Sequence, residues 1–224
     1  TMTQTVFDRN PTLAKPTGRT AWAESFEPKL EELRDSLRTR RPERVAELAG
    51  INWQPESRTL VLRHLDRGYR LGWPELVAHD VETGQPCGAE LQGLFLYYLE
   101  RAEGTPPTGN FVAFRELPDG GFYHSAFQGY TGALLEQRVG NDIDRLRRAV
   151  LAAGGHPTAV SDGGFTFNGL PRIPLALVYW LGDDEFPPQA QVLFDAVAGH
   201  YLPIDGSAAL GRRLVTRILK RLED

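Results

Sequence analysis

The sequence contains a single cysteine, Cys87, among its 224 residues. One thiol cannot form a disulfide within the chain, and it cannot supply the several thiolates of an iron–sulfur cluster or a thiolate zinc site. A single unpaired cysteine is typical of proteins kept in a reducing compartment. We therefore expect a cytoplasmic protein.

Long apolar runs are also missing. The longest, residues 173–181, is interrupted by Pro174 and falls far short of the roughly 20 residues that cross a bilayer. The N-terminus lacks the charged-then-apolar pattern of a signal peptide. A net charge of −4 argues against a surface built throughout for nucleic acid. We expect neither membrane insertion nor nucleic-acid binding.

Several catalytic motifs are absent as well. The chain has no Gly-x-Ser-x-Gly elbow to present a serine nucleophile and no Walker loop to hold phosphates. None of its five histidines forms the i, i+4 pair that builds a zinc site on a helix. Cys87 follows a proline and has no evident basic partner, so we expect an unreactive thiol.

What is present predicts a packed globular protein. Hydrophobic residues make up 41% of the chain and charged residues 24%, which is ordinary globular usage. Periodicity predicts helices over residues 24–37, 42–49, 88–101, 123–139, 142–153, 187–201 and 207–222. It predicts strands over residues 59–62, 69–71, 111–117, 158–160, 165–167 and 173–180.

These elements do not alternate strictly, which favours an α+β fold over a doubly wound sheet. We expect a single α+β domain over residues 23–224, with a mixed or antiparallel sheet packed against several helices. Residues 1–22 have no period, and we expect them to form a flexible N-terminal arm. The oligomeric state stays open.

The stretch YWLGDDEFPPQAQVLFD, residues 179–195, is the most unusual part of the chain. Two prolines suit the first turn of a helix, so the sequence predicts a strand followed by a helix over 187–201. Asp183, Asp184 and Glu185 would then stabilise the positive end of that helix, and Asp195 would lie on its solvated face. Alternatively, these four acids could hold a hard cation such as Mg²⁺.

Arg115 lies on the predicted strand over 111–117. Alternation puts its side chain on the same face as Phe111, Ala113 and Leu117. A guanidinium among apolar residues needs a carboxylate or an anionic ligand, because an unpaired buried charge is costly. The sequence predicts either an internal ion pair with residues 183–185 or an anion site.

A cleft at the strand ends is the favoured binding site. Its candidate lining residues are Arg115, Tyr123, His124, Trp180, Asp184 and Glu185. The hypothesis is a module that binds a small molecule, a cofactor or a protein partner. Two alternatives stay open, a metal-dependent hydrolase or lyase that uses Asp183, Asp184, Glu185 and Asp195, and a scaffold without a ligand.

The C-terminal helix is amphipathic. Its apolar stripe consists of Leu210, Leu214, Ile218 and Leu222. Its basic surface consists of Arg212, Arg213, Arg217, Lys220 and Arg221. Such a surface could contact phosphates, but no aromatic platform accompanies it.

Three segments together resemble a known family. They are LYYLERAEGTPPTGNFVAFREL (96–117), PRIPLALVYW (171–180) and GDDEFPPQAQVLFDAVAGHYLP (182–203). In this order they resemble an uncharacterised bacterial and archaeal family, domain of unknown function 3786, from about Leu30 onward. The resemblance implies no established activity. Some relatives carry a cysteine-rich iron–sulfur domain upstream; residues 1–22 contain no cysteine, so we expect no iron–sulfur cluster from this chain alone.

Overall fold

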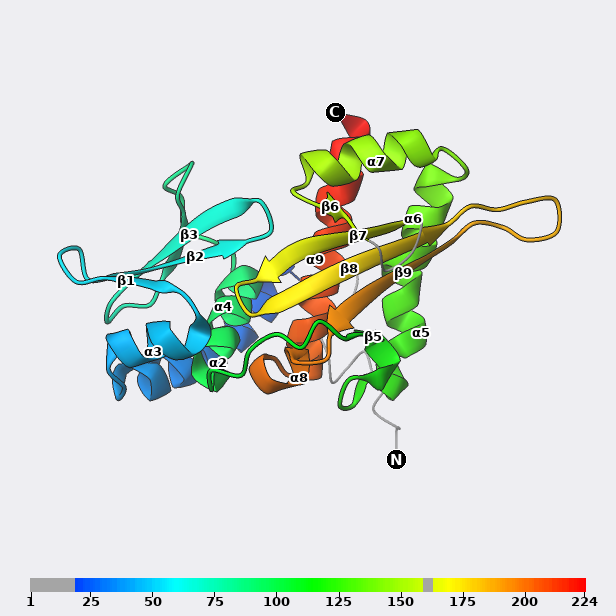
Figure 1. Cartoon of the computed structure of the whole chain (residues 1–224). Coiled ribbons are helices and arrows are strands. Elements are labelled where there is room, and N and C mark those ends of the chain that lie inside the picture. Colours follow the sequence, from blue (N-terminus) through cyan, green and yellow to red (C-terminus); the bar gives the residue numbers. More distant parts are fainter. Residues whose placement is uncertain (1–18, 159–162) are drawn as a thin grey trace.

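The structure is a computed structural model that describes residues 19–158 and 163–224. In the described part, helices pack against two antiparallel sheets that lie side by side (Figure 1). This is the α+β single domain that the sequence predicts. Most of the expected flexible arm, residues 1–18, lies outside the described residues, as do 159–162. The helix expected from residue 24 begins at Arg19.

The first sheet has four strands in the order β1-β2-β3-β4. They are β1 (Asn52–Gln54), β2 (Thr59–His64), β3 (Arg67–Gly72) and β4 (Ala78–Asp80). Its inner face is apolar because alternate residues such as Leu60, Leu62 and Leu71 are buried in the core. The expected hairpin over 59–71 is confirmed.

The second sheet has five strands in the order β5-β9-β8-β7-β6. They are β5 (Phe111–Ala113), β6 (His156–Pro157), β7 (Gly164–Leu170), β8 (Ile173–Trp180) and β9 (Gln189–Asp195). The apolar run over 173–180 forms β8 with the bounds that the sequence predicts. Short β6 ends just before the strand expected over 158–160, most of which lies outside the described residues.

The helices supply the other layer of the core. They are α2 (Arg19–Arg38), α3 (Pro42–Ala49), α4 (Ala89–Arg101), α5 (Gly120–Tyr130), α6 (Gly132–Val139), α7 (Ile143–Ala152), α8 (Ala198–Tyr201) and α9 (Ile204–Glu223). The predicted apolar stripe of α9 is buried along its whole length, and α9 passes behind the five-stranded sheet in Figure 1. The helix expected over 123–139 is divided into α5 and α6 at Thr131.

The two sheets are joined where β2 meets the end of β7. The backbone N–H of Leu65 donates to the carbonyl of Asn168 at 2.9 Å. His64 Nδ1 donates to the carbonyl of Gly169 at 2.7 Å. Because the carbonyl can only accept, His64 carries its proton on Nδ1 and leaves Nε2 as an acceptor.

The structure corrects the strand expected over 111–117. β5 ends at Ala113 and is followed by a 3₁₀ helix, η3 (Phe114–Glu116). The carboxylate of Glu116 accepts the backbone N–H of Ala113 at 2.7 Å, and this bond bends the chain away from the sheet. Arg115 is therefore exposed, and it does not share a face with the apolar strand residues.

The helix expected over 187–201 is also wrong. Gln189–Asp195 is strand β9, and only Ala198–Tyr201 is helical. The segment forms a strand because every second side chain, Ala190, Val192 and Phe194, is buried in the core. Pairing with β8 then satisfies the backbone along six residue pairs, from Leu175 with Phe194 to Trp180 with Gln189.

Candidate functional site

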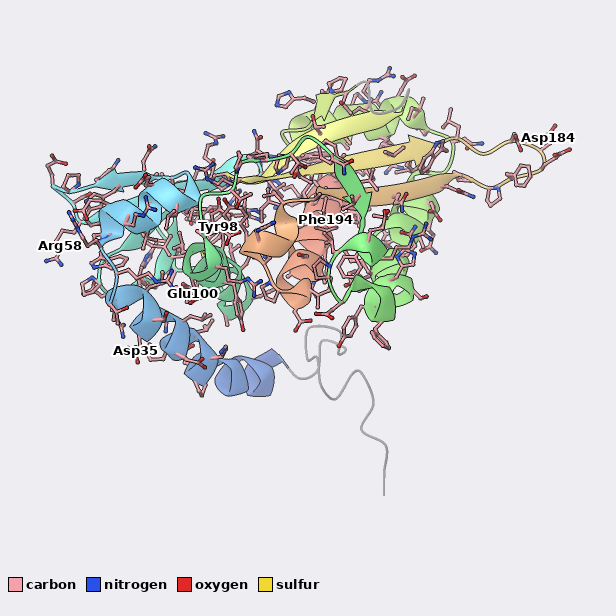
Figure 2. The ribbon with its side chains drawn as sticks, turned by 60° about the horizontal axis from the view of Figure 1, so that its bottom comes forward. Asp35, Arg58, Tyr98, Glu100, Asp184 and Phe194 are labelled. Carbon is pink, nitrogen blue, oxygen red and sulfur yellow. The ribbon has the colours of Figure 1, made fainter. Side chains whose placement is uncertain are left out.

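The β8–β9 hairpin projects beyond the helices that carry it. Residues 181–188, which we call the acidic tip, connect the two strands. Figure 1 shows this loop extending past α5 and α6, and Figure 2 shows Asp184 at its end, away from the body of the protein. The stretch that the sequence assigned to a strand–helix corner is thus a protruding strand–strand loop.

Asp183 fixes the conformation of the acidic tip. Its Oδ1 accepts the backbone N–H groups of Glu185 at 2.9 Å and Phe186 at 2.8 Å. Its own N–H donates to the carbonyl of Phe186 at 2.8 Å. The bonds from Glu185 and Phe186 lower the pKa of Asp183, because they stabilise its charged form. This carboxylate therefore stabilises a turn, and it is not available as a free ligand.

Gly182 and Asn141 hold the base of the tip. A Cβ on Gly182 would lie 2.7 Å from the nitrogen of Pro188, so the chain closes here only with glycine. The Asn141 amide accepts the Gly182 N–H at 2.8 Å and donates to the Gly182 carbonyl at 3.2 Å. The hydroxyl of Tyr179 donates to the carbonyl of Gly140 at 2.6 Å. The loop between α6 and α7 thus anchors the hairpin.

Two side chains from the helices anchor the other strand. Glu136 Oε1 accepts the backbone N–H of Ala190 at 2.8 Å, and Gln128 Nε2 donates to the Ala190 carbonyl at 2.8 Å. Both bonds hold the beginning of β9 against α5 and α6. The hairpin is therefore fixed to the core up to the tip, and the tip itself is closed by its own hydrogen bonds.

The acidic tip exposes large apolar side chains. Trp180, which precedes the tip, is 46% exposed, Leu181 is 52% exposed and Phe186 is 63% exposed. They account for half of the six exposed large apolar side chains in the described part of the chain. Asp184 and Glu185 lie beside them, exposed and without an ion pair to any described residue. Apolar and acidic groups are thus concentrated on one small protrusion.

The six candidate cleft residues lie on two parts of the fold. Arg115 is on η3, and the half-buried Tyr123 and His124 are on α5. Trp180 ends β8, whereas Asp184 and Glu185 are in the acidic tip. No ion pair among the described residues involves Arg115. The expected pairing of Arg115 with residues 183–185 is therefore wrong, and binding by these six residues stays a prediction.

Asp195 has a different role from the one expected. It is fully buried at the end of β9 and not on a solvated helix face. Its carboxylate accepts four hydrogen bonds, from Thr108 N (3.1 Å), Thr108 Oγ1 (2.8 Å), Gly109 N (2.7 Å) and Val197 N (2.9 Å). Burial raises the pKa of Asp195, but these donors outweigh burial, and the net pKa is lowered. Asp195 therefore fastens the 105–110 loop to β9.

The four acids of the cation alternative do not form one cluster. Asp195 lies at one end of β9, and Asp183, Asp184 and Glu185 lie beyond the other end. Among the described residues, no group of three or more histidine, cysteine or acidic side chains could hold a metal ion. The four acids thus have three different roles. Asp183 closes the turn of the acidic tip, Asp195 holds the 105–110 loop to β9, and Asp184 and Glu185 are exposed on the tip.

The basic surface of α9 faces acids of the protein itself. Arg217 pairs with Asp66, and Arg212 pairs with Glu90. Arg213 Nε donates to His64 Nε2 at 3.2 Å. Burial, followed by the charge of Arg213, lowers the pKa of His64 to about 3, so this histidine is neutral at physiological pH. Sequence periodicity could not reveal this cluster, because its members come from β2, the turn between β2 and β3, α4 and α9.

Cys87, which lies just before α4, is half-buried. Burial, helped by Asp80, raises the pKa of its thiol to about 11. The thiol is thus protonated at neutral pH, in agreement with the unreactive cysteine that the sequence predicts.

Comparisons with known proteins place the chain in a family but give it no activity. None of the described helices has the length and apolar character needed to span a membrane. No curated protein and no solved structure matches the chain. A family model described as "Domain of unknown function (DUF3786)" matches residues 41–217, which is well over half of the chain and includes the acidic tip. The chain therefore belongs to this family.

Proposed function

We propose that the protein is a docking module that binds a protein partner through the acidic tip of its β8–β9 hairpin. The observation that carries the proposal is the combination of Leu181 and Phe186, both more than half exposed, with the unpaired acids Asp184 and Glu185. Exposed apolar side chains that cluster within a few residues are typical of interaction sites.

The rigidity of the tip supports this function. Binding costs free energy when a loop must be ordered, and a loop that is already fixed avoids that cost. The hydrogen bonds of Asp183 and Asn141 hold the tip in one conformation before any partner arrives. Phe186 is an aromatic side chain with few rotatable bonds, as in the anchor residues of many interfaces.

The charges of the tip define the partner. Asp184 and Glu185 would repel an acidic surface and steer a basic one toward the tip. The partner surface should therefore combine arginine or lysine side chains with an apolar patch that receives Phe186. We also assign the protein to the cytoplasm, because its single cysteine, Cys87, forms no disulfide within the chain, as is usual in a reducing compartment.

Site-specific photo-crosslinking tests the proposal. A photoreactive phenylalanine analogue would replace Phe186 in one variant and Phe122 in a second, in cells that make the protein. Phe122 is 91% exposed but lies on α5, so it reports random encounters. We expect a discrete protein crosslink from position 186 that is absent from position 122. Equal, diffuse labelling from both positions would refute a docking tip.

A further inference from the structure

The outer face of the four-stranded sheet is basic. The register pairs Arg70 of β3 with Val61 of β2 and with His79 of β4, so these three side chains form one row. Arg63 lies two residues after Val61 on the same face of β2. The neighbouring inner-face residues Leu62 and Tyr69 are buried, whereas Arg63 and Arg70 are exposed.

Among the described strands no acid points to this face, and the one carboxylate found beside an outward strand position is that of Glu75, 3.8 Å from where a Cβ on Gly72 would lie. Its outward strand residues are Asn52, Gln54, Thr59, Val61, Arg63, Gly68, Arg70, Gly72 and His79. Arg70 forms no ion pair with any described residue, and Arg63 reaches only the backbone carbonyl of Asp66 at 3.4 Å. The Asp66 carboxylate is paired with Arg217 and that of Asp80 with Arg67.

The basic face and the acidic tip lie at opposite ends of the molecule. Figure 1 shows the four-stranded sheet on one side of the molecule and the acidic tip on the other, and Figure 2 shows Asp184 at the end of the tip. The tip therefore cannot reach the basic face of its own chain. Two surfaces of opposite charge are left unpaired within the described structure, and each has apolar side chains, Leu181 and Phe186 on the tip and the half-buried Val61 on the sheet.

We infer that the partner of the acidic tip is a second copy of this chain, which receives the tip on the outer face of its four-stranded sheet. Asp184 and Glu185 of one copy would pair with Arg63 and Arg70 of the next. The inference rests on the proposed docking function and names its partner. Because the two surfaces differ, the contact closes into a two-fold dimer if each copy receives the tip of the other, and it generates a larger ring or an open filament if it does not.

This contact has a predictable salt dependence. Raising the salt from about 0.1 M to about 1 M shortens the Debye length from about 10 Å to about 3 Å. Ion pairs on exposed surfaces weaken over this range, whereas burial of Phe186 does not. Self-association should therefore decrease with salt without vanishing, and removal of both the charges and the apolar side chain should weaken it further.

Sedimentation velocity of the full chain over a concentration series tests the inference. The tip variant would carry Asp184→Asn, Glu185→Gln and Phe186→Ser, with Asp183 left intact to close the turn. The sheet variant would carry Arg63→Gln and Arg70→Gln. Arg147→Gln with Arg148→Gln on the exposed face of α7 is the matched control, because it also removes two arginine charges. Circular dichroism would confirm that every variant is folded.

We expect concentration-dependent association of the native chain and of the control, weakened at least about tenfold in the tip and sheet variants. A mixture of these two variants should form a one-to-one complex that grows no further, since it contains one intact tip and one intact sheet face. A native chain that stays monomeric, or a mixture without the complex, would overturn the inference. The photo-crosslinking experiment at position 186 separates this inference from the proposed docking function. A crosslink to a different protein would support docking through the tip even if self-association failed.

Discussion

His64 should make the stability of this protein depend on pH between pH 6.5 and 3. The imidazole is 2% exposed, donates to the carbonyl of Gly169 and accepts from Arg213. Its pKa is about 3 in the fold and about 6.5 in the unfolded chain. Below pH 6.5 the unfolded state therefore binds a proton at His64 that the folded state does not bind until the pH is near 3. The free energy of unfolding falls as the pH falls through this range.

The size of the effect follows from these two values. A gap from 6.5 to about 3, at 1.36 kcal/mol for each pKa unit, corresponds to about 5 kcal/mol over the whole window. Between pH 7.5 and pH 5 the expected loss in the free energy of unfolding is about 2 kcal/mol. Ordinary carboxylates stay mostly ionised over this range, so the histidine contribution can be separated.

Urea unfolding at pH 7.5, 6 and 5 measures this loss. His64→Asn keeps a hydrogen-bonding side chain but cannot titrate, and His156→Asn changes an exposed histidine as the matched control. The native chain and the His156 variant should both lose about 2 kcal/mol of unfolding free energy. The His64 variant should be less stable at pH 7.5 but nearly independent of pH. A His64 variant with the same pH dependence as the native chain would refute the reasoning.

Two further predictions concern buried groups. Asp195→Ala should lower the free energy of unfolding by about 3 kcal/mol, since it leaves the N–H groups of Thr108, Gly109 and Val197 without their acceptor; urea unfolding checks this, and a change below about 1 kcal/mol would contradict the clamp. Cys87, with a thiol pKa of about 11, should react with Ellman's reagent at pH 8 about 100-fold more slowly in the folded chain than in urea, and equal rates would show a thiolate that burial does not suppress.

The C-terminal helix α9 and the central strand β8 could be predicted because their signals are local. The stripe from Leu210 to Leu222 repeats every four residues, and all four of its leucine and isoleucine side chains are buried. The apolar run of β8 is too short for most helices and is bounded by turn residues, so its type and bounds were accessible from sequence.

β9 could not be assigned because its signals conflict locally. The residues from Gln189 to Phe194 alternate in burial, yet Leu193, Val197 and Tyr201 also have helical spacing, and a proline pair precedes them. The hydrogen bonds to β8 decide between the two, and they depend on residues far away in the chain. The wrong placement of Arg115 on a strand has the same cause. β5 extends only as far as its pairing with β9, which ends at Ala113, before Arg115 is reached.

The acids of residues 179–195 show what sequence can and cannot predict about a site. The expectation that an acid here stabilises local backbone holds for Asp183, although it closes a turn and not a helix. The sequence placed Asp195 on a solvated helix face because it predicted a helix where the structure has strand β9. The protrusion of Asp184 and Glu185 from the body depends on the length of the hairpin beyond its anchors, which no local pattern encodes.

Docking through the acidic tip is the central claim, and crosslinking yield tests it most directly. The photoreactive analogue at position 186 would be compared in the native tip and in a tip with Asp184→Asn and Glu185→Gln. We expect a strong discrete crosslink from the native tip and a yield reduced at least about tenfold when both charges are removed. A yield that is unchanged by this neutralisation, or no higher than that from position 122, would contradict the claim.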